Sequence, residues 1–197
     1  MNIYKKYIKR AIDFFLALFA LILLSPLFLL TALIIKIDSP GPVFFKQRRI
    51  KAGKATFTML KFRTMRTDAP KDTPTHLLAD PTAYISRSGR ILRKYSIDEI
   101  PQLLHIITGT MSIVGPRPAL WNQDDLIAER DKYNANDPKP GITGWAQING
   151  RDELPIPVKA KLDGEYTQNI SFWFDCKCIL GTFKAVAGAK GVVEGRK

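Results

Sequence analysis

The longest apolar run of the chain lies near its start. From Phe14 to Ile35 no residue is charged, and this run exceeds the ~20 residues that a helix needs to cross the hydrocarbon core of a bilayer. Basic residues flank it on both sides, with Lys9 and Arg10 before it and Lys36 after it. Because the orientation of a spanning helix follows from an asymmetry of such residues, and little asymmetry is present, both ends of the run are expected on the cytosolic side.

Ser25 and Pro26 lie at the middle of this run. Proline lacks an amide hydrogen and its ring clashes with the preceding turn, so we expect a kink or break here. The Ser25 hydroxyl can donate to a nearby carbonyl that the break releases. A re-entrant helix pair, which enters and leaves through one leaflet, accounts for the break and for the basic flanks. A mildly kinked spanning helix accounts for the proline equally well, so the residues alone leave both alternatives open.

The pattern after the apolar run predicts an α+β fold, a mainly helical small domain with a short β-hairpin. Two strand-like runs, 43–47 and 56–65, are joined by a turn with the sequence KAGK. Alternation in the second run places Lys61 and Arg63 on one face. A long loop is expected over 67–83, and a Gly-rich loop over 139–151. Helices are expected at 86–108 in two pieces, about 122–134 and about 172–187. The two parts of the chain are then the membrane helix, 1–38, and the domain, 39–197.

The last predicted helix carries an apolar stripe. Its members follow a spacing of three and four residues, which places them on one face: Cys176, Ile179, Leu180, Phe183 and Ala187. Three aromatic residues at 172–174 begin the helix. Since aromatic side chains are enriched at membrane interfaces, the helix is either an interfacial amphipathic helix or a helix packed on the core, and both interpretations stay open.

Charge narrows the choice of partners. The chain has 30 Lys and Arg against 18 Asp and Glu, a net charge of +12 at pH 7. Such an excess attracts polyanions, which include nucleic acid, anionic lipid and phosphorylated small molecules. No nucleic-acid-binding motif accompanies the charge, so we expect no nucleic acid as partner, although a membrane-tethered basic protein that binds nucleic acid or anionic lipid remains the alternative function. A second copy of the chain is a further candidate partner.

Asp98 and Glu99 are adjacent acids in a basic stretch, within the sequence YSIDEIPQL. One interpretation is purely structural: Ser96 and Glu99 have the spacing of a capping box, and Pro101 suits a first helical turn. The other interpretation is chemical. Neighbouring helical residues point about 100° apart, so one carboxylate can attack an atom while the other binds a metal ion or a proton.

Four ordered motifs decide between these interpretations. The segments LKFRTM, SIDEIPQL, MSIVGPRP and PGITGWAQINGR, placed after an apolar run with a central Ser-Pro, resemble the bacterial sugar transferase family and its small monotopic phosphoglycosyl transferases. The resemblance covers about Lys5 to Ala187. It implies a membrane enzyme at the cytosolic face of a bacterial inner membrane, with a re-entrant helix and with both termini in the cytosol. This enzyme transfers a sugar-1-phosphate from a UDP-sugar to a polyprenyl (undecaprenyl) phosphate and releases UMP, the first membrane step in the assembly of a glycan or polysaccharide.

The resemblance also implies roles for individual residues. Asp98 corresponds to the nucleophile that forms a phosphosugar-aspartyl intermediate, and Glu99, together with Asp98, to the ligands of Mg²⁺. Lys61 corresponds to the lysine of the family's K-F-R-T-M segment, and Arg63 shares its strand face. Arg93 corresponds to a basic position for the lipid or sugar phosphate.

Three further candidates lie later in the chain. Arg117 is held between two prolines, whose fixed φ lowers the entropic cost of presenting a guanidinium to phosphate or uracil. Arg151 ends the Gly-rich loop. Asp175 corresponds to another acidic position of the family, expected to act as a metal ligand or to orient the substrate.

Overall fold

The computed structural model describes residues 3–70, 80–150 and 154–187. Two of the sequence-based predictions concern residues outside these ranges, one of them only in part. The predicted loop at 67–83 is described only at its two ends, and Arg151 lies outside the described residues.

The apolar run folds as two helices that meet at a sharp bend. A π-helical turn, η1 (Tyr4–Ile8), leads into α1 (Lys9–Leu23), and α2 (Ser25–Asp38) follows at an angle of 61°. The Ser25 hydroxyl donates to the carbonyl of Ile22 at 2.8 Å, which satisfies one acceptor at the break. Among the described residues no single helix has the length and hydropathy to cross a bilayer, whereas this bent pair has both together. The break predicted from Pro26 is therefore confirmed.

The predicted hairpin is present. Strand β1 (Phe44–Ile50) pairs antiparallel with β2 (Thr56–Phe62), and Phe45 lies opposite Lys61. The turn between them, η2 (Ala52–Lys54), has Gly53 at φ +66°, a conformation that glycine adopts without strain. The second strand ends at Phe62, three residues before the predicted boundary.

Helices surround this hairpin. The stretch 86–108 forms two helical pieces as predicted, α3 (Arg87–Lys94) and a second piece in which η5 (Ile97–Gln102) continues into α4 (Leu103–Ile107). A short turn η4 (Pro81–Ala83) precedes them. The remaining helices are α5 (Asp124–Asp131), α6 (Trp145–Ile148), α7 (Ile156–Gln168) and α8 (Phe172–Ala187). A parallel pair of short strands, β3 (Ser112–Val114) and β4 (Gly141–Thr143), joins segments far apart in the chain. Strand β4 and helices α6 and α7 lie where no regular element was predicted.

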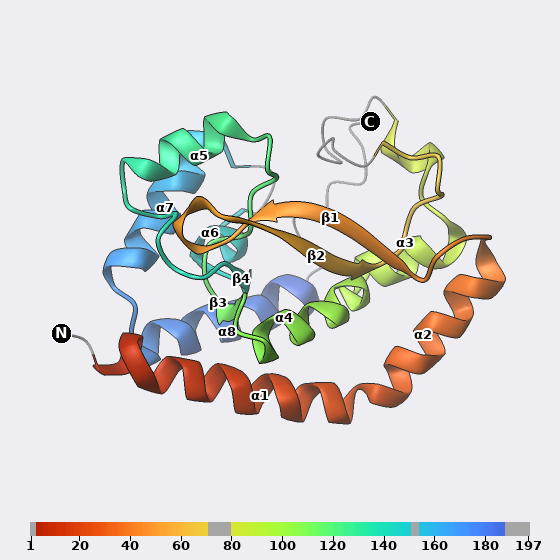
Figure 1. Ribbon diagram of the computed structural model, residues 1–197, viewed down its shortest axis with the longest axis horizontal. Coiled ribbons are helices and arrows are strands. Elements are labelled where there is room, and N and C mark those ends of the chain that lie inside the picture. The colour runs from red at the N-terminus through yellow and green to blue at the C-terminus, as the bar shows by residue number, and fades with distance from the viewer. Residues whose placement is uncertain (1–2, 71–79, 151–153, 188–197) are drawn as a thin grey trace.

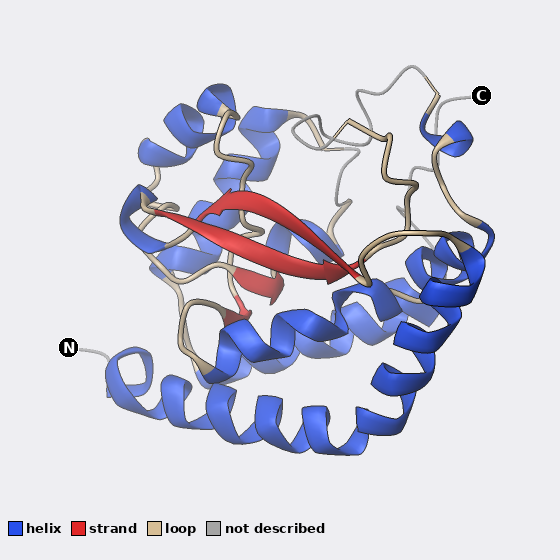
Figure 2. Ribbon diagram, turned by 45° about the vertical axis from the view of Figure 1, so that its right-hand side comes forward, coloured by secondary structure: helices blue, strands red, loops and turns tan. Residues whose placement is uncertain are grey.

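Helices α4 and α8 lie between the bent pair and the hairpin (Figure 1). Figure 1 shows α1 and α2 along one edge of the molecule, with α4 and α8 next to α1 and the hairpin beyond them, and Figure 2 shows the same order after a turn. Three buried clusters hold these layers together: Ala17 with Ile106 and Met111; Ile35 with Phe62 and Leu92; and Val114 with Tyr166, Ile170 and Cys178. The first two clusters join the bent pair to the rest of the domain.

The bent pair and α8 nevertheless expose large apolar side chains. In α8, Trp173 is 78% exposed, Leu180 63% and Phe183 70%, while the buried side of the helix carries Asp175 and Cys178. Within the predicted stripe Ile179 packs against the buried cluster around Tyr166, whereas the interpretation as a core-packed stripe is wrong for Leu180 and Phe183. Further exposed apolar residues lie on α1 and α2: Phe15, Phe19, Ile22, Leu23, Leu29, Leu33 and Ile37. An exposed surface of this kind marks an interaction site.

Candidate active site

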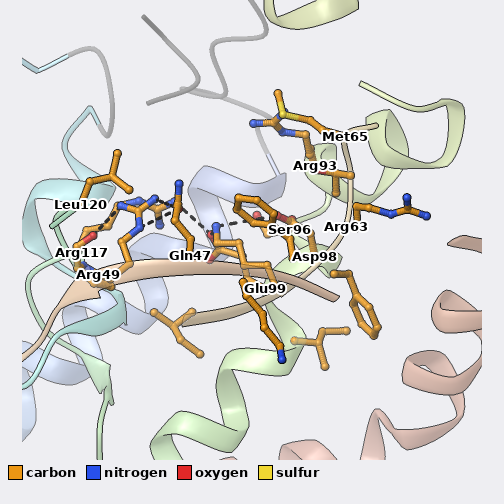
Figure 3. A pocket seen from close by; sticks show the side chains of 18 of the residues that line it. Gln47, Arg49, Arg63, Met65, Arg93, Ser96, Asp98, Glu99, Arg117 and Leu120 are labelled. Carbon is orange, nitrogen blue, oxygen red and sulfur yellow. Dashed lines mark hydrogen bonds and ion pairs between the residues drawn. The ribbon is translucent and has the colours of Figure 1, made fainter. Parts of the chain in front are cut away.

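A cavity of about 810 Å³ lies along the hairpin. Its wall includes Ala20 and Leu24 beside the helix bend, and also Arg130 of α5 and Lys159 of α7. The wall also includes six predicted candidates, of which Figure 3 labels all but the first: Lys61, Arg63, Arg93, Asp98, Glu99 and Arg117. The structure thus brings together six of the eight predicted site residues.

The acidic pair lies in a 3₁₀ turn, not at the start of an α-helix. Ser96 has left-handed backbone angles (φ 55°, ψ 25°), and its side chain does not cap η5. The amide of Glu99 donates to the backbone carbonyl of Ser96 at 3.2 Å instead. Pro101 lies inside η5 and is buried. The capping-box interpretation is therefore wrong, and a structural need for a cap does not account for the two acids.

Glu99 is bound by two cations. Its Oε1 accepts from Lys61 Nζ at 2.7 Å and from Arg117 Nη2 at 3.2 Å (Figure 3). Asp98 lies deeper, 8% exposed, and its Oδ2 is 4.0 Å from the same Lys61 Nζ. One lysine therefore faces both acids but bonds only Glu99 closely.

This asymmetry separates the acidity of the two carboxyls. Burial raises the pKa of Asp98, and the adjacent charge of Glu99 raises it further, against the lowering effect of Lys61, Arg93 and Arg117. Burial would also raise the pKa of Glu99, but the charges and hydrogen bonds of Lys61 and Arg117 outweigh burial and hold that pKa below its usual range. Glu99 is consequently a fixed anion, while Asp98 is the more basic carboxylate.

Arg63 holds a backbone turn. Its guanidinium donates from Nη1 to the carbonyl of Pro40 at 2.5 Å and from Nη2 to that of Ser39 at 2.8 Å. The side chain is 5% exposed and points away from Asp98 and Glu99 (Figure 3). The expected pairing of Lys61 and Arg63 on one phosphate-facing surface is therefore not what the structure shows, because Arg63 follows the end of β2 and ties down the connection between α2 and β1.

Asp175 lies outside the cavity wall. It is 5% exposed and accepts from the Tyr4 hydroxyl at 2.6 Å, from Lys9 Nζ at 2.6 Å and from the Tyr166 hydroxyl at 2.7 Å. These bonds connect α8 with the start of α1 and with α7. The structure thus separates Asp175 from Asp98 and places it in a buried polar network that joins three helices.

Gln47 and Arg49 are among the residues of the cavity wall that were not singled out from the sequence. Gln47 and Arg49 lie on the face of β1 that Phe45 shares, and all three line the cavity. The alternation of the strand carried the signal that could have found them, because Gln47 and Arg49 follow Phe45 at a spacing of two, and Phe45 lies opposite Lys61.

The cavity wall is strongly basic. Nine lysines and arginines line it among the described residues, against the two acids Asp98 and Glu99; the basic residues are Lys46, Arg49, Lys61, Arg63, Arg66, Arg93, Arg117, Arg130 and Lys159. Arg130 is compensated by a buried ion pair with Asp163 at 2.6 Å. A wall of this composition attracts an anionic ligand, since cations within a cleft focus the field on it.

The donor set for a metal ion is small. Within the described part of the chain no three Asp, Glu, His or Cys side chains gather closely enough to hold an ion by themselves. Asp98 and Glu99 supply two carboxylates, and Mg²⁺ is commonly bound by one or two carboxylates with waters and substrate phosphates completing its octahedron. The pair therefore fits Mg²⁺ that arrives with a phosphorylated substrate.

A buried basic carboxylate, a second carboxylate fixed by two cations, and a cationic wall are together typical of an enzyme that acts on phosphorylated substrates. Residues 4–189 match the model of the family described as "Bacterial sugar transferase", and the chain belongs to this family.

Three relatives illustrate the match. The chain is 40% identical over 187 residues to the "Uncharacterized sugar transferase EpsL" of Bacillus subtilis (strain 168), which covers 95% of this chain and 91% of that protein. It is 36% identical over 197 residues to the "Exopolysaccharide production protein ExoY" of Sinorhizobium fredii, covering 93% and 87%. It is 42% identical over 183 residues to a "UDP-glucose:undecaprenyl-phosphate glucose-1-phosphate transferase" of Caulobacter vibrioides, covering 88% and 67%.

Proposed function

We propose that the protein transfers a sugar-1-phosphate from a UDP-sugar to a polyprenyl phosphate and releases UMP. The names of several relatives describe this reaction with undecaprenyl phosphate as the acceptor. The observation that carries the proposal is the position of Asp98 in a cation-lined cavity whose wall reaches the bend between α1 and α2. Such a cavity serves a reaction between a water-soluble donor and a lipid phosphate.

The chemistry proceeds in two displacements at one phosphorus. A carboxylate oxygen of Asp98 attacks the phosphorus that bears the sugar, the bond from that phosphorus to the oxygen of UMP breaks, and UMP leaves with the electron pair. An oxygen of the polyprenyl phosphate then attacks the same phosphorus and the Asp98 carboxylate leaves, which regenerates the enzyme. A covalent intermediate divides one difficult exchange into two easier ones, and the bond from the sugar carbon to oxygen stays intact.

The two acids divide the work according to their surroundings. Glu99 has one oxygen bonded by both Lys61 and Arg117, so its charge is already neutralised and its basicity is low. Asp98 bonds Lys61 less closely, and its raised pKa gives the ionised form a stronger affinity for an electrophile. We therefore assign nucleophilic attack to Asp98 and orientation of the site to Glu99.

Mg²⁺ is the cofactor that this site suits, held by Glu99 and Asp98 with the donor's diphosphate. When bound, the ion supplies positive charge to the diphosphate and to departing UMP. Lys61 and Arg117 stabilise the same oxygens from the protein side, and Arg93 is available for the acceptor or sugar phosphate.

The exposed apolar surface of α1, α2 and α8 supports placement at a membrane. The bend of 61° allows the pair to enter and leave through one leaflet, with both termini in the cytosol. In that arrangement Ala20 and Leu24 lie at the cavity wall beside the bend, so a polyprenyl phosphate reaches Asp98 without leaving the headgroup region. Tags on both termini are expected to react with impermeant reagents only from the cytosolic side; labelling of the N-terminus from outside would favour a spanning helix.

The reaction is tested by incubating the purified protein with undecaprenyl phosphate, Mg²⁺ and a panel of UDP-hexoses and UDP-N-acetylhexosamines while UMP release is measured. At least one sugar is expected to give UMP. Asp98→Asn should abolish UMP release and the sugar-phosphate adduct detectable by mass spectrometry, while Asp124→Asn, on an exposed acid of α5, should retain both. Full activity of the Asp98→Asn variant would exclude the nucleophile assignment, and no UMP from any donor would exclude the reaction.

A further inference from the structure

Arg49 joins the hairpin to the segment that carries Arg117. Its Nε and Nη2 donate to Gln47 Oε1 at 2.9 and 2.6 Å, and its Nη1 donates to the backbone carbonyl of Pro118 at 2.8 Å (Figure 3). Three nitrogens of one guanidinium thus bind two acceptors at fixed angles. Lysine cannot reproduce this geometry, because its ammonium is a single point of donation.

The backbone repeats the same connection. The amide of Ile50 donates to the carbonyl of Ala119 at 2.9 Å, and Arg49 forms an isolated antiparallel bridge with Leu120. Strand β1 therefore has β2 on one edge and residues 118–120 on the other. Arg117 directly precedes this segment.

The position of Arg117 depends on the hydrogen bonds between β1 and residues 118–120. Prolines at 116 and 118 cannot donate backbone hydrogen bonds, so the segment is held through its carbonyls: that of Pro116 accepts from the Gly141 amide at 2.9 Å, and that of Pro118 accepts from Arg49. The Arg117 side chain is 36% exposed and must reach Glu99 at 3.2 Å from outside η5. A displacement of about 1 Å in such a group can lower a rate by ~100-fold.

We infer that Arg49, oriented by Gln47, is a positioning residue that fixes the Pro116–Pro118 segment so that Arg117 meets Glu99 and the donor's diphosphate. The inference rests on the proposed function for the identity of the donor. Arg49 itself acts through Arg117, and Gln47 acts through Arg49. The pair is separated from Lys61 and Asp98 in the sequence but shares their cavity.

A kinetic double-mutant cycle tests the inference. Arg49→Lys is expected to lower kcat/KM for the UDP-sugar by ~10-fold, and to change the same parameter, kcat or KM, that Arg117→Lys changes. In the Arg117→Ala background the Arg49→Lys substitution should cost less than about twofold, because residues that act through one another are not additive. Gln47→Leu, which removes the acceptor but keeps the volume, should show the same dependence on Arg117.

Arg48 provides the matched control. It lies on the opposite face of β1, with its guanidinium 3.7 Å from the Trp121 ring, and does not line the cavity. Arg48→Lys should leave kcat and KM unchanged. Equal losses from Arg49→Lys with and without Arg117, or no loss with Arg117 present, would overturn the inference, whereas absence of UMP from the wild-type protein would overturn the proposed function instead.

A second readout needs no substrate. The side-chain Nε–H resonance of Arg117, assigned by its loss in Arg117→Lys, should show a lower order parameter in Arg49→Lys than in the wild-type protein. An unchanged order parameter in a folded Arg49→Lys variant would overturn the positioning role regardless of the reaction catalysed.

Discussion

Substitution of Asp175 is expected to destabilise the protein strongly. Its carboxylate accepts three hydrogen bonds, from the Tyr4 and Tyr166 hydroxyls and from Lys9 at 2.6 Å, and the side chains of the Asp175–Lys9 ion pair are 7% and 12% exposed. Removing one partner of a buried ion pair costs about 3–5 kcal/mol, because the other charge is left uncompensated. Asp13, 3.8 Å from Lys9, retains part of the compensation, so we expect about 3 kcal/mol for Asp175→Asn.

That loss should lower the melting temperature by roughly 6–12 °C, since 1 kcal/mol corresponds to about 2–4 °C in a chain of this length. The assay is thermal unfolding followed by circular dichroism in one detergent and at one protein concentration. Glu129→Gln is the control, because Glu129 pairs with the exposed Lys132 and such surface pairs contribute little. The folded fraction of Asp175→Asn should retain the wild-type KM for the donor. A wild-type melting temperature together with a raised KM would refute the structural role and support direct contact with substrate.

Three further outcomes are expected. Because burial raises the pKa of Asp98, the acidic limb of the pH–rate profile should lie at a higher pH than an ordinary carboxyl would give. Lys61→Met removes a charge that lowers this pKa, so it should move the acidic limb to still higher pH. A move of the limb to lower pH would contradict the assignment. Gly89→Ala should destabilise the protein by about 1–3 kcal/mol despite the better helix propensity of alanine, because an added Cβ would lie 2.1 Å from the carbonyl oxygen of Thr64; a raised melting temperature would be the contrary result. Trp173→Ser should weaken sedimentation with anionic vesicles, since Trp173 is 78% exposed; unchanged sedimentation would argue against an interfacial α8.

Local patterns predicted the elements that depend on local physics. The break at Pro26 follows from the missing amide of one residue, and the hairpin follows from alternation around a turn. Helix α7 escaped prediction because its buried side includes Asp163, whose burial is possible only through the ion pair with Arg130 on α5. Gly164 on the same buried side also interrupts the apolar periodicity of the helix. An added Cβ there would lie 2.4 Å from Tyr133 Cβ. Contacts with a distant helix therefore decide both positions, and no local pattern shows them.

For the candidate site, the sequence predicted which residues take part but not where every side chain points. Motifs identified Lys61, Asp98, Glu99 and Arg117, and the structure places these four residues in one ion-paired cluster. A motif does not show the direction of a side chain. The side chain of Arg63 points to the backbone of Ser39 and Pro40, because β2 ends at Phe62, between Lys61 and Arg63.

Arg10, one of the basic residues before the apolar run, also binds the helix that follows the turn of Asp98. From sequence these residues were one half of a cytosolic flank, yet Arg10 donates to the carbonyls of Ile106 and Ile107 at 2.5 and 2.8 Å, in the helix that continues from the turn bearing Asp98. Asp13 accepts from the Ser112 hydroxyl at 2.6 Å beside the same region. These contacts bind helix α1 to the domain through charged groups that each have a partner. Under the proposed placement at a membrane, the depth of α1 therefore sets the depth of Asp98.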